Sequence, residues 1–161
     1  MNIRKIIREE IEKTLLKEEL GTKTYVVDTS QEALEDEMYD AQGEVQTFLR
    51  PAIDDYPEDT YEDLFGDYKH PEILAISDIT SPGQIEGFKM MISKQGKYGL
   101  DTVKSLKNAM KKGKPIPPVT IKKDWNNSFS LISGRHRILA ALELGLTHVP
   151  ALRMYRRNEG N

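Results

Sequence analysis

The chain has 161 residues, of which 38% are hydrophobic and 30% are charged, a composition typical of a globular protein with one domain and an appendage. It contains no cysteine, which excludes disulfides, thiolate catalysis and cysteine-based zinc sites. No apolar run approaches the ~20 residues that span a bilayer, and the charged N-terminus differs from a signal peptide, so we expect a cytoplasmic protein without a membrane partner.

The formal net charge of −3 hides an acidic half and a basic half. Arg50 is the only base in residues 31–67, which are rich in Asp and Glu. Residues 89–137 show the reverse, with only Asp101 and Asp124 opposing their lysines and arginines. The basic half indicates attraction for nucleic acid or nucleotide phosphates. Two alternatives stay open: the halves only keep the protein soluble, or the acidic segment folds over the basic face as an internal anion.

An amphipathic helix is predicted over residues 1–21, because isoleucine and leucine recur there at helical spacing. Its apolar stripe must be covered, either by the core of this chain or by a partner. A partner could be a second copy, which would give a homo-oligomer, or another protein. In that case the protein would be a non-catalytic assembly protein that uses this helix.

The acidic segment that follows, residues 22–70, is predicted to form one helix and a linker. A short strand is expected at 25–27. A capping box of Thr29 and Glu32 should then begin a helix that ends near Ala41. The remainder is poor in aliphatic residues and rich in Asp, Glu, Tyr and Pro, which is typical of a loop with one helical turn.

The third segment, residues 71–157, carries strand and helix signals that predict an α+β domain. A buried strand is expected at 73–76, where four apolar residues stand together. Ser81 should cap a helix, with Pro82 at its first position and Gln84 completing a capping box. Asp101 is expected to cap a helix that Gly113 closes. The remaining predicted elements are strands at 119–121, 129–132 and 149–154 and a helix at 135–144.

The last predicted helix begins with three basic side chains, which a helix N-terminus disfavours. Each base there costs up to about 1 kcal/mol unless an anion binds at the same place. Gly134 would let an oxyanion approach the backbone, an arginine can grip phosphate with two donors, and a histidine can donate or move a proton. The predicted phosphate-binding residues are therefore Ser133, Gly134, Arg135, His136 and Arg137, with His136 as the candidate catalytic group. The alternative is that both arginines are solvated or pair with the acidic half, while His136 packs.

Three stretches carry a resemblance to a known superfamily. They are GKPIPPV at residues 113–119, ISGRHRILAA at 132–141, and Gly145 followed by VP at 149–150. In this order of strands and helices, about half of the chain resembles the ParB/sulfiredoxin superfamily. The resemblance implies a mixed sheet with packed helices and a Gly-x-x-Arg turn that holds nucleotide phosphates.

Members of that superfamily use the turn for different nucleotides. Partition proteins bind CTP and hydrolyse it slowly, whereas sulfiredoxins and a free-serine kinase use ATP or ADP. Carried over by position, Gly134, His136 and Arg137 match the phosphate turn. The resemblance therefore implies binding of a nucleoside triphosphate, CTP or ATP, with Mg²⁺ held mainly by its phosphates, together with slow hydrolysis and a DNA-related role. Some members are labelled nuclease-like, so a nuclease-like or DNA-binding accessory protein is the alternative.

Several positions depart from particular branches of the superfamily. Arg135 stands where sulfiredoxins need a cysteine, which excludes that activity. Partition proteins usually have a glutamate there and continue into a DNA-reading domain, whereas this sequence ends at Asn161, so we do not expect a sliding clamp. The serine kinases use a glutamate near the position of Gln84, so the kinase base is missing.

Two further groups of residues bear on partners and metals. Lys111, Lys112 and Lys114 are candidate nucleic-acid contacts, although a solvated helix face would also explain them. The histidines, His70, His136 and His148, lack ligand spacing, so no structural metal site is predicted.

Overall fold

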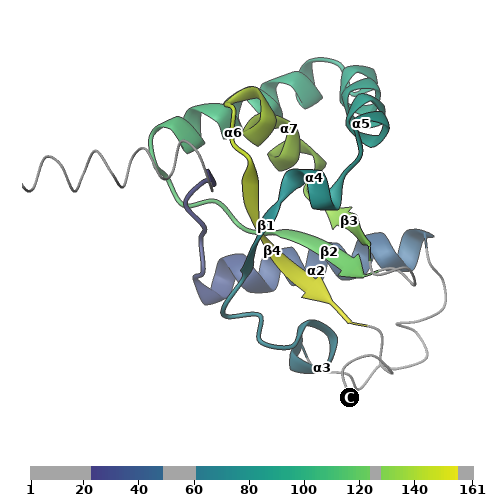
Figure 1. Ribbon diagram of the computed structural model, residues 1–161, viewed down its shortest axis with the longest axis vertical. Helices are drawn as coiled ribbons and strands as arrows, with labels where there is room; N and C mark the ends of the chain where they lie inside the picture. Colours follow the sequence, from purple (N-terminus) through teal and green to yellow (C-terminus); the bar gives the residue numbers. More distant parts are fainter. Residues whose placement is uncertain (1–22, 49–60, 124–127, 156–161) are drawn as a thin grey trace, which may run out of the picture.

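The computed structural model describes residues 23–48, 61–123 and 128–155 (Figure 1). The amphipathic helix predicted at 1–21, much of the predicted linker and the hairpin turn at 124–127 lie outside the described residues. The described elements are α2 (Gln31–Phe48), α3 (Tyr61–Phe65), β1 (Glu72–Ala75), α4 (Ile76–Ile79), α5 (Pro82–Lys94), α6 (Lys97–Lys111), β2 (Val119–Lys123), β3 (Phe129–Ser133), α7 (Arg135–Glu143) and β4 (His148–Met154).

The four strands form one mixed sheet in the order β1-β4-β2-β3. The β4 strand runs antiparallel to β1 and parallel to β2, and β2 and β3 form the predicted antiparallel hairpin. Helices pack against this sheet, so the predicted α+β class with a mixed sheet is confirmed. No helix in the described part of the chain is both long enough and apolar enough to cross a membrane.

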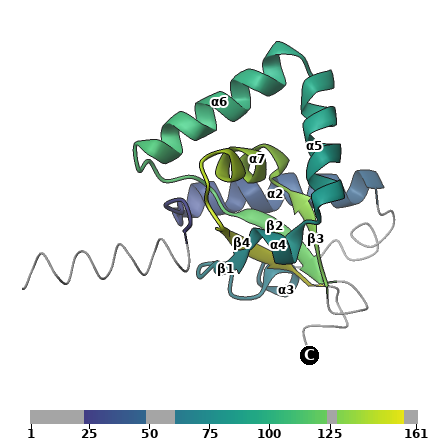
Figure 2. The same ribbon diagram turned by 45° about the horizontal axis from the view of Figure 1, so that its top comes forward.

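The sheet separates two buried clusters, because successive residues of β4 point to opposite faces. Val149 and Ala151 join the larger cluster, which also contains apolar side chains of α5, α6 and α7. Leu152 and Met154 join the smaller cluster, formed with α2 and α3. Figures 1 and 2 show α7 beside the sheet, with α5 and α6 at an angle to each other beyond it.

Helix α2 begins one residue later than predicted and is longer. The hydroxyl of Ser30, not that of Thr29, accepts the N–H of Ala33 at 3.3 Å and caps the helix. The helix continues past Ala41 to Phe48, because tertiary packing of its apolar face outweighs the weak local signal of the acidic sequence.

The strand predicted at 25–27 is only an isolated bridge between Val27 and Ile116. Its partner segment, residues 115–118, contains three prolines, which have no N–H to donate. A ladder of hydrogen bonds therefore cannot extend beyond Ile116, whose N–H donates to Val26 and whose carbonyl accepts from Asp28.

The strand predicted as buried at 73–76 is an edge strand with an exposed start. β1 pairs only with β4, Ile73 is 45% exposed, and Ile76 already belongs to the short helix α4. A compact apolar run does not distinguish an edge strand from a central one, because that depends on which strands pair with it.

The structure confirms the predicted start of α5 but not that of α6. The capping box at α5 is confirmed: Ser81 accepts the Gln84 N–H at 3.2 Å, and the Gln84 side chain accepts the Ser81 N–H at 2.8 Å. The cap at Asp101 is wrong, because α6 begins at Lys97 and Asp101 lies exposed inside it. Gly96, with φ of 65°, reverses the chain directly after α5, so α6 starts without a side-chain cap.

The close approach of α5 and α6 depends on Gly99. A Cβ at this position would lie 2.5 Å from the carbonyl oxygen of Ile92, so Gly99→Ala should lower the free energy of unfolding by about 1–3 kcal/mol. The matched control is Gly87→Ala within α5, where a Cβ meets nothing within 4 Å. That change should stabilise by up to about 1 kcal/mol, as helix propensity predicts. Urea unfolding measures both, and equal effects would contradict this account of the α5–α6 contact.

Candidate functional site

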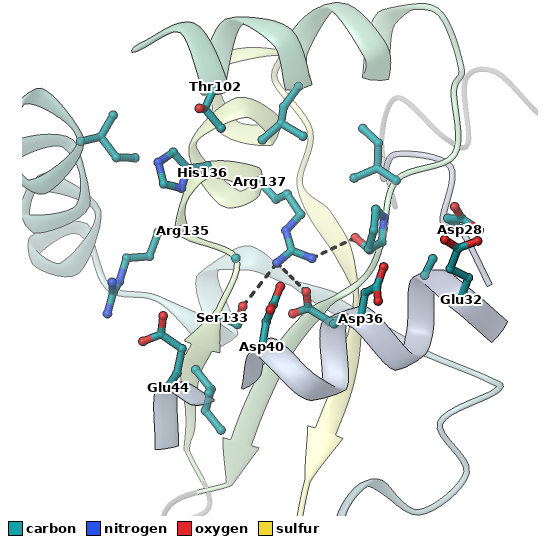
Figure 3. A pocket seen from close by; sticks show the side chains of 18 of the residues that line it. Asp28, Glu32, Asp36, Asp40, Glu44, Thr102, Ser133, Arg135, His136 and Arg137 are labelled. Atoms are coloured by element: carbon teal, nitrogen blue, oxygen red, sulfur yellow. Dashed lines mark hydrogen bonds and ion pairs between the residues drawn. The ribbon is translucent and has the colours of Figure 1, made fainter. Parts of the chain in front are cut away.

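A pocket of about 670 Å³ lies between α2, α5, α6 and the start of α7 (Figure 3). It brings all five predicted phosphate-binding residues to one place. Its lining comprises Asp28, Ser30, Glu32, Ala33, Asp36, Glu37, Asp40, Glu44, Met91, Ile92, Gln95, Thr102, Leu106, Ile116, Pro117, Ile132, Ser133, Gly134, Arg135, His136 and Arg137.

The turn that carries these residues is shaped by an irregular pairing of β2 with β3. Thr120 pairs with Ser133 and Ile121 pairs with Leu131, so β3 contains one extra residue at this point. The bulge sets the Thr120 and Ser133 hydroxyls beside each other at the end of the sheet. Gly134 follows with φ of 120°.

Gly134 has a packing role that its sequence context did not reveal. A Cβ there would lie 2.5 Å from Cγ1 of Val119 on β2. Together with the positive φ, this contact makes glycine the only residue that fits without strain. The fold therefore already requires glycine at position 134, and the predicted close approach of an oxyanion would be a second reason for it.

Helix α7 begins at Arg135, as predicted. Its first backbone hydrogen bond runs from the Ile138 N–H to the Gly134 carbonyl at 2.9 Å. The N–H groups of Arg135, His136 and Arg137 therefore have no acceptor within the helix, as is general for a first turn. The Arg135 guanidinium lies 5.9 Å from the centre of the Phe88 ring, at the edge of the pocket.

Arg137 is held in a buried ion pair with Glu37 of α2. Its Nη2 lies 2.8 Å from Oε2 of Glu37, and the two side chains are only 14% and 4% exposed. Arg137 also donates to the carbonyls of Pro117 and Pro118 and, at 3.4 Å, to the Ser133 hydroxyl. The alternative in which an arginine pairs with the acidic half is thus observed for Arg137.

Glu37 was not among the predicted site residues. The Thr120 hydroxyl donates to its Oε1 at 3.0 Å, on the side away from Arg137. Burial raises the pKa of the Glu37 carboxyl, while Arg137 and the hydroxyls of Thr120 and Ser133 act in the opposite direction. Only the charge reversal between the two halves pointed to this pair, and it did not single out Glu37.

His136 is half-buried and faces Gln95, the residue that follows α5. Its Nε2 lies 2.9 Å from the Gln95 side-chain oxygen, a contact that places the ring proton on Nε2. Partial burial, followed by the charges of Arg137 and Arg135, lowers the pKa of His136. The ring is therefore neutral near pH 7, so the free site carries less positive charge than its sequence suggests.

The wall opposite α7 is acidic. Asp28, Glu32, Asp36, Asp40 and Glu44 follow one another at intervals of four residues, which places the helical members on one face of α2. All five line the pocket, and Figure 3 shows their carboxylates across from the basic start of α7. The pocket thus has two walls of opposite charge.

The other candidate residues lie apart from this pocket. Lys111, Lys112 and Lys114 are exposed at the end of α6, and their role in nucleic-acid contact stays a prediction. His70 contacts Asp67, and His148 contacts Thr147, so the histidines are not brought together. Within residues 23–48, 61–123 and 128–155, no group of three or more His, Asp or Glu side chains has an arrangement that could hold a metal ion.

These features define an α+β domain in which a hairpin leads through a glycine turn into a basic helix that faces a pocket. Residues 89–157 match the family model of the ParB N-terminal domain. The chain therefore carries a ParB-like domain, and the resemblance seen in the sequence is confirmed. The matched segment includes the whole turn but not α2. A comparison with curated proteins found no match.

The buried pair should make Arg137 important for the stability of the fold. Removing one partner of such a pair leaves an uncompensated charge, so Arg137→Ala should lower the free energy of unfolding by about 3–5 kcal/mol. The double change Glu37→Leu with Arg137→Met should recover much of that loss, because no buried charge remains. The control Arg135→Ala should cost about 1 kcal/mol or less, since it loses only a contact with Phe88. Similar losses for both arginines in urea unfolding would contradict this assignment.

The pKa of His136 should lie below its ordinary value of 6.5. An NMR titration of the ring measures it directly, and Arg135→Ala should move the midpoint upward because one repelling charge is removed. The unfolded chain binds this proton more readily, so stability should fall as the pH drops from about 6.5 through the folded-state pKa. A midpoint at or above 6.5 in the folded protein would be the contrary result.

Proposed function

We propose that this protein binds a nucleotide through its phosphates, in the pocket at the start of α7. The observation that carries the proposal is the meeting of Arg135, His136 and the first turn of α7 at that pocket. The ParB N-terminal domain match at residues 89–157 supports it, because the matched segment contains this turn. The volume of about 670 Å³ is within the range of small-molecule sites, roughly 300–1,000 Å³.

Each group at the turn has a distinct role in this proposal. The N–H groups of the first turn of α7 and the Arg135 guanidinium receive phosphate oxygens. His136, neutral in the free protein, takes up a proton as the anion approaches and then adds a charged donor. Arg137 has a supporting role in the free protein, because Glu37 and two proline carbonyls already occupy its donors.

The rest of the pocket suits the uncharged part of a nucleotide. Met91, Ile92, Leu106 and Ile116 give it an apolar side on which a base or sugar can pack. CTP and ATP are the nucleotides that the resemblance implies, with Mg²⁺ carried in on the phosphates. Slow hydrolysis with His136 as the proton carrier is the finer expectation, and it rests on the resemblance together with the neutral state of the ring.

The other functions have less support. A DNA-binding or nuclease-like role rests on Lys111, Lys112 and Lys114, which lie outside the pocket. A role in assembly rests on residues 1–21, which lie outside the described residues. The pocket therefore favours nucleotide binding over these two alternatives.

Calorimetry with CTP, ATP and inorganic triphosphate, each with Mg²⁺, tests the proposal. Arg135→Ala should weaken binding by about tenfold or more, as expected for a charged hydrogen bond to phosphate. The control Lys111→Ala removes the same charge outside the pocket and should change affinity by less than about twofold. Absence of binding by every probe at millimolar concentration would contradict the proposal. A larger effect of Lys111→Ala than of Arg135→Ala would favour the DNA-related surface.

A further inference from the structure

The Glu37 carboxylate already sits where an anion is expected. It is ion-paired with Arg137, accepts the Thr120 hydroxyl and lies close to that of Ser133. A guanidinium and two hydroxyls gathered at a glycine turn are donors that a phosphate oxygen would also use. In the free protein, a carboxylate of α2 therefore occupies these donors.

The same helix makes the rest of the pocket electrostatically unfavourable for a second anion. Asp36 directly precedes Glu37 and Asp40 follows it by three residues, and both line the pocket. A polyphosphate that reached Arg135 and His136 would face these carboxylates across the cavity (Figure 3). Like charges at such a site disfavour binding as long as α2 stays in place.

The ion pair of Glu37 carries a cost that favours its replacement by another anion. Burial raises the pKa of the Glu37 carboxyl, because the ionised carboxylate loses hydration at this position. Helix α2 buries only Leu34, Met38, Glu37 and Ala41 among the residues whose burial is described, and its outer face is exposed and acidic. Local opening of such an element is a smaller event than unfolding of the sheet.

We propose that α2 is a built-in inhibitor of the pocket, in which Glu37 holds Arg137 in place of a ligand phosphate. Phosphate and Glu37 exclude each other, so a nucleotide binds fully only when α2 moves away, and Arg137 then joins Arg135 as a phosphate contact. This inference rests on the proposed nucleotide site and adds its regulation. The helix that regulates it lies outside the matched segment at residues 89–157.

Two variants of the full chain test the inhibitor role. Glu37→Gln removes the competing charge but keeps hydrogen-bond acceptors for Thr120. Glu35→Gln makes the same change on the same helix at an exposed position outside the pocket. Calorimetry with inorganic triphosphate and with Mg²⁺-CTP and Mg²⁺-ATP should show about tenfold or tighter binding by Glu37→Gln, because apparent affinity scales with the fraction of open molecules. Glu35→Gln should stay within about twofold of the wild type.

The outcomes separate the inhibitor role from the nucleotide site itself. If the wild type binds nucleotide through Arg135 and the two glutamine variants match it, the site stands and the inhibitor role is overturned. If no variant binds any probe, both are overturned. Tighter binding by Glu37→Gln than by the wild type and Glu35→Gln supports both.

A second measurement needs no variant and applies even if Glu37→Gln does not fold. Hydrogen exchange of residues 31–48 is followed in the wild-type protein with and without saturating triphosphate or nucleotide. Displacement of α2 predicts faster exchange in this helix when the ligand is bound. Unchanged or slower exchange at saturation would overturn the inhibitor role.

Discussion

The ion pair between Glu37 and Arg137 joins the parts of this protein that make the site. Arg137 belongs to α7, Glu37 to α2, and the hydroxyl groups around them come from β2 and β3. Because both charges are buried, neither can be left without a partner except at a large penalty, so in the free protein the pair ties the four elements to one arrangement. This contact fixes the direction of the Arg137 side chain and brings α2 to the start of α7.

The pair is one point at which the acidic and basic halves of the sequence meet. The acidic helix α2 and the basic start of α7 line opposite sides of the pocket. Only Glu37 is buried at the contact, however, and the other carboxylates of α2 remain exposed or half-buried along the pocket wall. The result is a cavity with separate positive and negative sides.

The ion pair between Glu37 and Arg137 also limits which side chains at the turn can contact a ligand in the free protein. Arg135, His136 and Arg137 all line the pocket, but the donors of Arg137 are already engaged with Glu37 and two proline carbonyls. The ParB-like segment at residues 89–157 supplies the turn and most of the sheet, and α2 supplies the opposite wall from outside that segment. The properties of the site thus depend on a helix that the match does not include.

The sequence by itself determined the α+β class, the capped start of α5, the hairpin, the glycine turn and the basic start of α7. These features depend on neighbours in the chain, such as the Ser81–Gln84 capping box or the change from strand to helix at Gly134. Tertiary structure alone decided that β1 is an edge strand, that α2 extends to Phe48, and that Glu37 pairs with Arg137. Those outcomes depend on contacts between residues far apart in the chain, where burial and charge pairing outweigh local propensity, and no local pattern encodes which carboxylate will be buried.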